Sequence, residues 1–118
     1  MADSKQFQSV LCFDKTITIA NGQTVSEAID LIGTYVVALI IPSTFDGTTL
    51  ALQASDTLTG TYLNVYNTSG TQVVATVAAS RYVPFVPSDT ASIRFLKLVA
   101  GTTQTGDTII TLVTRPLA

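Results

Sequence analysis

SIRFLKLVAG, residues 92–101, is a strand-length segment with apolar side chains on both faces. Ile93 and Phe95 alternate with polar neighbours, as they would in a strand with one buried face. The alternation then breaks, because Lys97 falls on the same face as Phe95 while Leu96 falls on the other. Which face meets the core decides what the remaining surface of this strand can contact.

Two arrangements satisfy this pattern. In the first, Ile93 and Phe95 point to the core, and Leu96 and Leu98 face outward, under a loop, the N-terminal arm or another subunit. In the second, a β-bulge after Phe95 exchanges the faces, which turns both leucines inward and puts Lys97 in solvent. We expect the first arrangement, which makes Leu96 and Leu98 candidate interface residues.

On both sides of this segment, the chain consists of short strand patterns separated by turn signals. Asn21-Gly22 and the stretch NTSG at 67–70 are strong turn sequences. RYVPFV (81–86) contains Pro84, which favours an edge or a bend. The expected strands are residues 15–19, 34–41, 49–55, 61–66, 71–78, 81–86, 92–100 and 108–114.

This spacing predicts an all-β fold: a single-domain antiparallel β-sandwich with about eight strands and at most one short helix. Residues 1–14 are expected to form an N-terminal arm, and residues 15–118 the β-sandwich domain. The helix candidate is TVSEAIDLI at 24–32, where Thr24 and Glu27 have the spacing of a capping box. A strand followed by a loop is the alternative for the same residues.

The composition is poor in charge. Charged residues make up 12% of the chain, against about 25% in typical soluble domains, and 20 residues are threonine. Such a surface is either carried by neutral hydroxyls and amides or partly covered by protein. The runs YVVALII (35–41), FLKLV and TIITLV are apolar on both faces, which exceeds the need of one inter-sheet core. We expect loops, the arm and other chains to share in covering the surplus.

Charge and composition also exclude several partners. A net charge of −2 and scattered Lys and Arg residues argue against direct binding of nucleic acid. The polar start MADSKQFQ predicts no secretory signal, and no apolar run approaches the length of a membrane-spanning helix. Cys12 is the single cysteine, so no intrachain disulfide is expected, and we interpret Cys12 as a small buried apolar residue.

Catalytic chemistry has little support in the residues. The chain has no histidine, which removes the commonest general base and the Ser-His-Asp arrangements. Its carboxylates mostly stand beside Gly, Ser or Thr, as in Asx turns. GTTQTG (101–106) lacks the lysine and the following helix of a phosphate loop, so it is interpreted as a flexible hairpin loop. We therefore expect no enzyme, no catalytic or cofactor-binding residue, no cofactor and no metal.

Two weaker alternatives remain open at this point. A calcium site would draw its ligands from loop carboxylates. An aromatic platform for sugars would use the tyrosines, although tyrosines spread over strands more often sit at the rim of a core. The carboxylates are Asp46, Asp56, Asp89 and Asp107, and the tyrosines are Tyr35, Tyr62, Tyr66 and Tyr82.

From residue 34 to the C-terminus, the order of several sequence segments is similar to that in small virion proteins of tailed bacteriophages. The segments are VVALIIPSTFDGTTLALQAS, TYLNVYN, RYVPFVPSDTASIRFLKLVAGT and the closing TLVTRP. In this order they resemble capsid cement, or decoration, proteins and related head and tail accessories. The resemblance implies a jelly-roll-like sandwich.

The resemblance further implies a non-enzymatic structural protein on the capsid surface of the virion, synthesised in the host cytoplasm. It would bind the major capsid protein, stabilise the phage head and self-associate as a dimer or trimer, without contacting a membrane. The expected interface residues are Phe7, Leu11 and Phe13 in the arm, with Leu96 and Leu98 on the second face. The alternative is a carbohydrate-binding β-sandwich module of a phage tail or fibre, used for host attachment.

Overall fold

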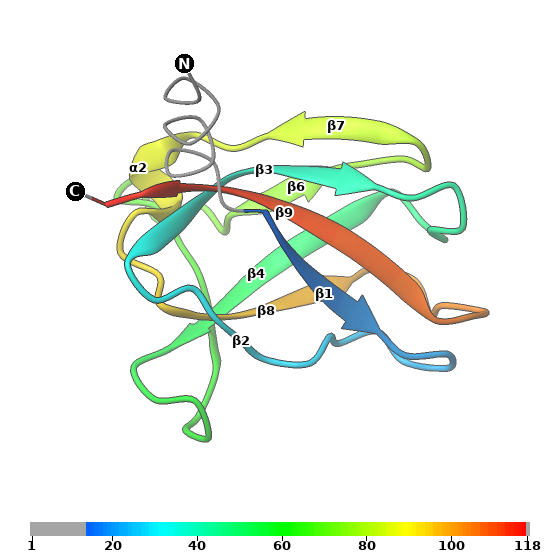
Figure 1. The fold of residues 1–118 in the computed structure, drawn as a ribbon, viewed down its shortest axis with the longest axis horizontal. Helices are drawn as coiled ribbons and strands as arrows, with labels where there is room; N and C mark the ends of the chain where they lie inside the picture. Colours follow the sequence, from blue (N-terminus) through cyan, green and yellow to red (C-terminus); the bar gives the residue numbers. More distant parts are fainter. Residues whose placement is uncertain (1–13, 118) are drawn as a thin grey trace, which may run out of the picture.

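The computed structural model describes residues 14–117, which form two packed β-sheets (Figure 1). The elements are β1 (Lys15–Ile19), β2 (Ile29–Asp30), β3 (Thr34–Ile41), β4 (Thr49–Ser55), β5 (Leu63–Asn64), β6 (Val74–Thr76), β7 (Arg81–Pro84), the helical turn α2 (Pro87–Thr90), β8 (Phe95–Ala100) and β9 (Thr108–Pro116). The first sheet has the order β1-β9-β3-β7. The second has the order β2-β8-β4-β5, and β6 also pairs with β4.

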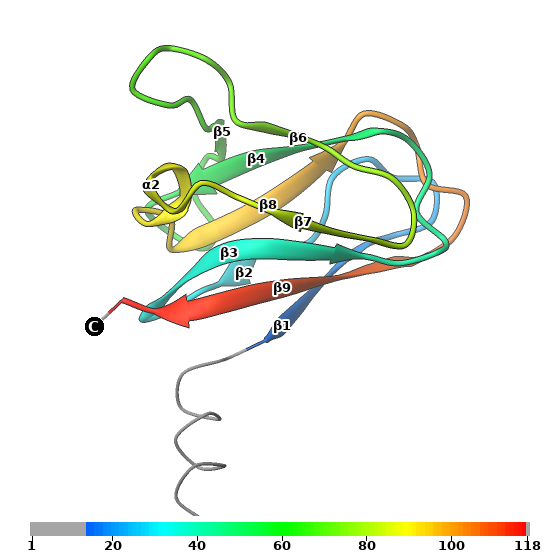
Figure 2. The same ribbon diagram turned by 90° about the horizontal axis from the view of Figure 1, so that it is seen from above.

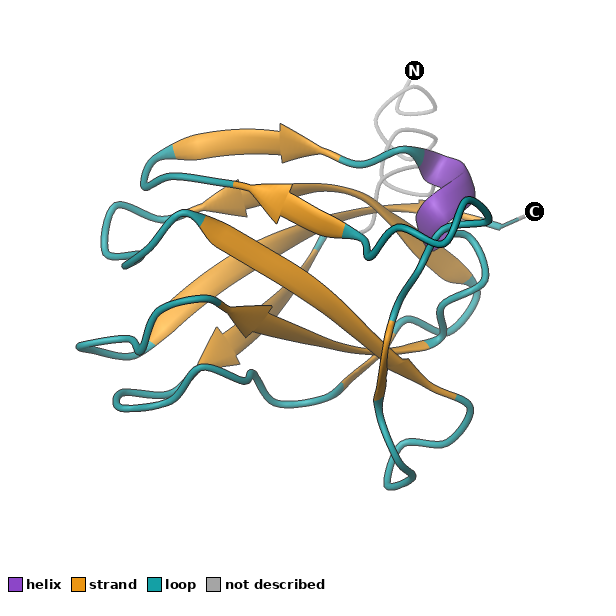
Figure 3. Cartoon of the chain, turned by 180° about the vertical axis from the view of Figure 1, so that it is seen from behind, coloured by secondary structure: helices purple, strands orange, loops and turns teal. Residues whose placement is uncertain are grey.

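These nine strands confirm the predicted single-domain, all-β antiparallel sandwich, within the part of the chain that the structure describes. Figure 2 shows β3 and β9 in one layer, and β4 and β8 in the other. Figure 3 shows the helical turn α2 among the strands. The first strand begins at Lys15, while the arm predicted at 1–14 lies almost entirely outside the described residues.

The core lies between the two sheets and is filled by aliphatic side chains. Leu52 pairs with Leu98 in the second sheet, and Leu39 pairs with Leu112 in the first. All four are buried members of one apolar cluster. Burying each such side chain contributes about 1.5–3 kcal/mol to the stability of the fold.

Strand β8 corrects the expected orientation of SIRFLKLVAG. Leu96 and Leu98 are 1% and 0% exposed and face the inter-sheet core, so their predicted outward placement is wrong. Phe95 and Lys97 lie on the outer face instead, opposite Ser55 and Gln53. The pairing with β4 shows no register shift, and the faces differ from the expectation because the strand begins only at Phe95. Residues 92–94 belong to a loop, so Ile93 does not set the alternation.

The β-bulge of the fold lies in β3, not in β8. The register of β3 with β9 shifts between Val36 and Ala38, which leaves Val37 as the extra residue. Val36 and Leu39 both reach the core, although three positions apart they would face opposite sides of a regular strand. The bulge thus places more of the apolar run 35–41 in the core than strict alternation allows.

Residues 24–32 follow the alternative that the sequence left open, a strand with loops. Val25 forms a bridge with Val99, and β2 pairs with β8. The backbone N–H of Glu27 donates to the Thr18 carbonyl, and its carboxylate accepts from the Thr18 N–H, both at 3.1 Å. The capping-box glutamate therefore binds a strand edge. The helical turn forms instead at α2, where proline occupies the first turn and needs no N–H partner.

The orientation of β8 leads to a stability prediction. Leu98→Ala should lower the free energy of unfolding by about 2–5 kcal/mol, because it removes a buried side chain from the central row. Lys97→Ala should cost about 1 kcal/mol or less, since it removes an outer-face contact with the Tyr62 ring. Urea denaturation of the two variants measures both effects, and a larger loss for Lys97→Ala would contradict the assigned faces.

Candidate functional site

The two long sides of the sandwich are built differently. On the side of β1 and β8, Ser26 and Glu27 hydrogen-bond to both sheets. The Ser26 N–H donates to the Leu98 carbonyl at 2.9 Å, and the Leu98 N–H donates to the Ser26 hydroxyl at 2.8 Å. Glu27 is bound to Thr18 of β1 in a similar two-way manner. This side is closed, whereas the opposite side, between β6 and β7, contains a groove.

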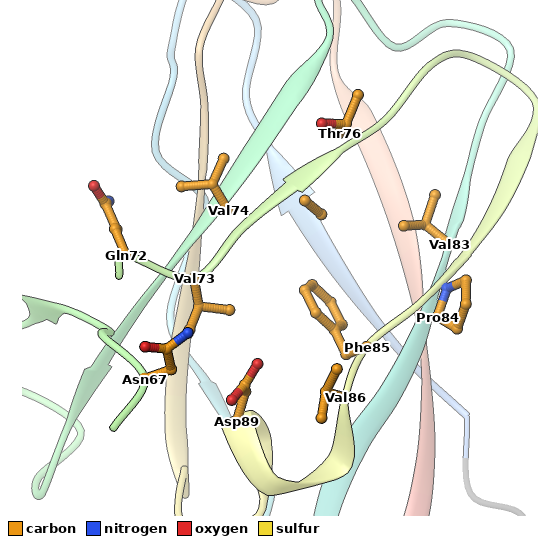
Figure 4. A pocket seen from close by; sticks show the side chains of 11 residues that line it. Asn67, Gln72, Val73, Val74, Thr76, Val83, Pro84, Phe85, Val86 and Asp89 are labelled. Atoms are coloured by element: carbon orange, nitrogen blue, oxygen red, sulfur yellow. The ribbon is translucent and has the colours of Figure 1, made fainter. Parts of the chain in front are cut away.

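On that opposite side the structure has a groove of about 310 Å³, which we call the edge groove (Figure 4). Figure 4 shows Val73 on one wall and Val83 and Phe85 on the other, with Val86 and Asp89 near its end. Asp89 is the one charged residue among those that line it. The edge groove therefore lies between the edges of two sheets and has mixed walls, with apolar Val73, Val83 and Phe85 beside polar residues and a carboxylate at one end.

Local sequence explains why this side stays open. The chain leaves β6 in the second sheet and enters β7 in the first through residues 77–80. Ser80 turns this connection in the left-handed region, at φ 59°, and its N–H donates to the Pro42 carbonyl at 3.3 Å. β7 pairs with β3 alone, so Pro84 sits in an edge strand, as predicted. Because β6 and β7 belong to different sheets, their edges do not pair with each other, and side chains line the space between them.

A second groove of about 600 Å³, the end groove, lies beside the first. Leu63, Tyr66 and Ile93 are among its lining residues, and Asp56 is its one charged residue. The Val73 N–H, on the wall of the edge groove, donates to the carbonyl of Val65, which lines the end groove, at 2.8 Å. The two grooves are thus neighbours across one hydrogen-bonded ribbon.

Four of the eleven large apolar side chains that are exposed in the described residues line these grooves. The exposed fractions are 69% for Leu63, 60% for Val86, 57% for Tyr66 and 44% for Val74. Each of the four contributes to the lining of one groove. Exposed apolar side chains beside a groove are candidates for contact with a protein or a ligand. We call these four residues together with the two grooves the apolar edge.

The outer face of the second sheet, in contrast, is polar and internally paired. The Arg94 guanidinium donates to both oxygens of Asp30, at 3.0 and 3.3 Å, and lies 4.8 Å from the Phe95 ring centre. The Arg94 hydrogen bond, aided by the Ile32 N–H, holds the pKa of Asp30 below its ordinary value. Both side chains are well exposed, so solvent screening leaves this pair little weight in stability.

Lys97 completes this outer face. Its ammonium lies 4.5 Å from the centre of the Tyr62 ring, and the Tyr62 hydroxyl donates to the Leu58 carbonyl at 2.8 Å. Partial burial, and secondarily the charge of Asp30, raises the pKa of Tyr62. Lys97, which interrupts the alternation of residues 92–101, thus contacts an aromatic ring on the surface. The hydrogen bond from Tyr62 to Leu58 lies within the loop between β4 and β5.

The tyrosines do not form one platform. Tyr62 lies on the outer face of the second sheet, with Lys97. Tyr82 pairs with Ile40 on the first sheet, and Tyr66 lines the end groove. Tyr62 and Tyr82 are thus on different sheets and cannot contact the same sugar ring.

The loop at 101–106 is anchored, in contrast to the flexible hairpin that we expected. Gln104 is 1% exposed, and its carboxamide makes four hydrogen bonds. Its oxygen accepts from the Asp46 N–H at 3.1 Å and the Thr108 hydroxyl at 2.9 Å, and its nitrogen donates to the carbonyls of Asp46 and Thr102 at 2.8 and 3.0 Å. Backbone bonds add the turn at Gly22. Gln104 therefore joins three loops at this end of the sandwich: its buried amide links its own loop to the loop of Asp46, and its backbone carbonyl binds the turn at Gly22.

The carboxylates proposed as a calcium pool have local partners or lie apart. Asp46 accepts from the N–H and the hydroxyl of Thr105, at 2.9 and 2.8 Å, which holds its pKa below the ordinary value. Asp107 accepts from the Asn21 N–H at 2.9 Å, whereas Asp56 and Asp89 line different grooves. Among residues 14–117, no three His, Cys, Asp or Glu side chains come together as metal ligands.

The predicted interface residues fall into two groups. Leu96 and Leu98 are core residues and have no surface with which to meet a partner, so they are corrected here. Phe7, Leu11 and Phe13 lie outside residues 14–117. The sequence reasoning missed Leu63 and Val86, although Val86 stands between two prolines in a segment already assigned to an edge, which is a signal for exposed backbone and side chains.

Comparisons with known proteins add no assignment. No family model matches the sequence, and neither a curated protein nor a solved structure matches it. In the part of the chain that the structure describes, no helix is long and apolar enough to cross a membrane.

The anchored loop end leads to a stability prediction. Gln104→Leu should lower the free energy of unfolding by at least about 2 kcal/mol, because it leaves several buried donors and acceptors without partners. Gln53→Leu is the matched control, since Gln53 makes a more exposed bond to Asn64, and we expect a change within about 0.5 kcal/mol. Urea denaturation measures both, and equal losses would contradict the anchoring role of Gln104.

Asp46 should contribute to acid sensitivity. Because its pKa is lowered in the folded chain, its contribution is present at pH above the ordinary aspartate value of about 3.9 and is lost as the pH falls through the folded value. Asp46→Asn should therefore flatten the decrease of the melting temperature below about pH 5, and Thr105→Val should flatten it partly. Thermal melts between neutral and acidic pH test this, and an unchanged slope in Asp46→Asn would contradict it.

Proposed function

We propose that this chain is a non-enzymatic structural protein of a bacteriophage particle, a capsid cement or decoration protein that binds the outside of the head through its apolar edge. The observation that carries the proposal is that two neighbouring grooves are lined by four exposed apolar side chains, Leu63, Tyr66, Val74 and Val86. The resemblance of residues 34–118 to small virion proteins is the reason for proposing a phage particle as the partner.

The charge distribution supports a protein partner. The grooves contain one carboxylate each and no basic side chain among their lining residues. On the outer face of the second sheet, Arg94 instead pairs with Asp30, and Lys97 lies over the Tyr62 ring. A partner at the apolar edge therefore gains mainly from burial of apolar area, at about 25 cal/mol per Å².

Repetition compensates for a modest single contact. Burying one of these side chains contributes about 1.5–3 kcal/mol, which corresponds to roughly a 10- to 150-fold change in affinity. On a shell whose subunits repeat, several such contacts act at once, and the effective concentration of each site raises the overall affinity. No chemistry at a reactive side chain is required for this role.

The proposal predicts a specific loss of head binding. Val86→Asp should weaken co-sedimentation of the chain with heads prepared without this protein by at least tenfold, because it places a charge in apolar contact surface. Val25→Asp is the matched control, since Val25 is also exposed but lies on the closed side of the sandwich, and it should sediment as the wild type does.

Circular dichroism and thermal melts establish that both variants are folded. Failure of the wild-type chain to bind heads, or equal binding by Val86→Asp and Val25→Asp, would overturn the proposal. Mass spectrometry of purified virions gives an independent measure: a head protein is present in high copy number, whereas a tail component is present in a few copies.

A further inference from the structure

We propose that the edge groove of one copy receives residues 7–13 of a neighbouring copy of the same chain. The inference rests on the proposed assembly role and names the contact by which copies join. Three features support it: a groove open to an extended segment, a segment of matching pattern, and a sheet register that keeps residues 12 and 13 out of the groove of their own copy.

The edge groove suits an extended apolar segment. It runs between the edges of the two sheets, and Val73, Val83 and Phe85 form its walls. Val83 and Phe85 already pack against the core cluster with part of their surface, so an inserted side chain would extend that cluster. Val86, at 60% exposure, remains to be covered.

Residues 7–13, FQSVLCF, have the matching pattern. In an extended conformation, Phe7, Leu11 and Phe13 share one face, because successive side chains of a strand alternate. Lys5 is the one charged residue from 4 to 13, and Asp89 is the one charged residue lining the edge groove. Apolar pattern and charge therefore complement the groove together.

The sheet register keeps residues 12 and 13 out of the groove of their own copy. Lys15, where β1 begins, lies in the same row as Leu112, Leu39 and Val83. Three inter-strand spacings separate Lys15 from Val83, or about 14 Å. Cys12 precedes Lys15 by three residues, which span at most about 11 Å. A chain thus cannot lay residues 12 and 13 in its own edge groove, whereas a neighbouring copy can.

The single native cysteine provides the test. Val86→Cys places a second thiol at the groove, and Val25→Cys, on the closed side, is the matched control. Each full-length variant is mixed as equal parts of ¹⁴N- and ¹⁵N-labelled protein and oxidised with copper phenanthroline. The disulfide-linked peptides are then identified by mass spectrometry.

We expect Val86→Cys to give Cys12-to-86 peptides that combine both isotopes, at a yield at least fivefold above the Cys12-to-25 peptides of the control. Purely intrachain links would overturn the inference, as would equal yields in the two variants. Head binding is measured separately with Leu63→Asp, in the end groove, because Val86 belongs to both proposed contacts; a failure of this contact is then distinguishable from a failure of the proposed function. In a second measurement, Phe13→Asp should decrease self-association in analytical ultracentrifugation, and unchanged association would likewise count against the inference.

Discussion

Two stacked sheets have two long sides, and the way in which each is sealed determines the rest of this molecule. Ser26 and Glu27 seal one side, because their backbone and side-chain atoms bond to β8 and β1 together. The other side depends on apolar side chains at the crossing from β6 to β7. The edge groove, the exposed residues around it and the proposed contacts all follow from this unequal closure.

Local chemistry made much of the fold predictable from the sequence. Gly22, after Asn21, and Gly70, at the end of its turn, adopt the positive φ that glycine allows, at 80° and 81°. Pro84 lies in an edge strand because it lacks an N–H for a second neighbour. These features depend on residues close in the chain, and the strand pattern between them was enough to identify an antiparallel sandwich.

Features that depend on distant partners were not predictable in the same way. The faces of β8 are set by where pairing with β4 begins, which the alternation of residues 92–98 does not reveal. Thr24 and Glu27 match a capping box, yet the edge of β1 offers Glu27 a better partner. The sequence did not predict the apolar edge, because Leu63 and Val74 have the pattern of ordinary strand residues. Only the sheet order shows that their strands, β5 and β6, lie at the margin of the second sheet.

The buried Gln104 amide has a consequence for how the two ends of the sandwich respond to ionic strength. Its four side-chain bonds join neutral groups in a dry setting, and dissolved ions screen charges while leaving such dipoles nearly untouched. The Arg94–Asp30 pair near the opposite end is exposed and ionic. Salt should therefore weaken the exposed pair, at little cost in stability, while the contacts of the uncharged amide keep their strength.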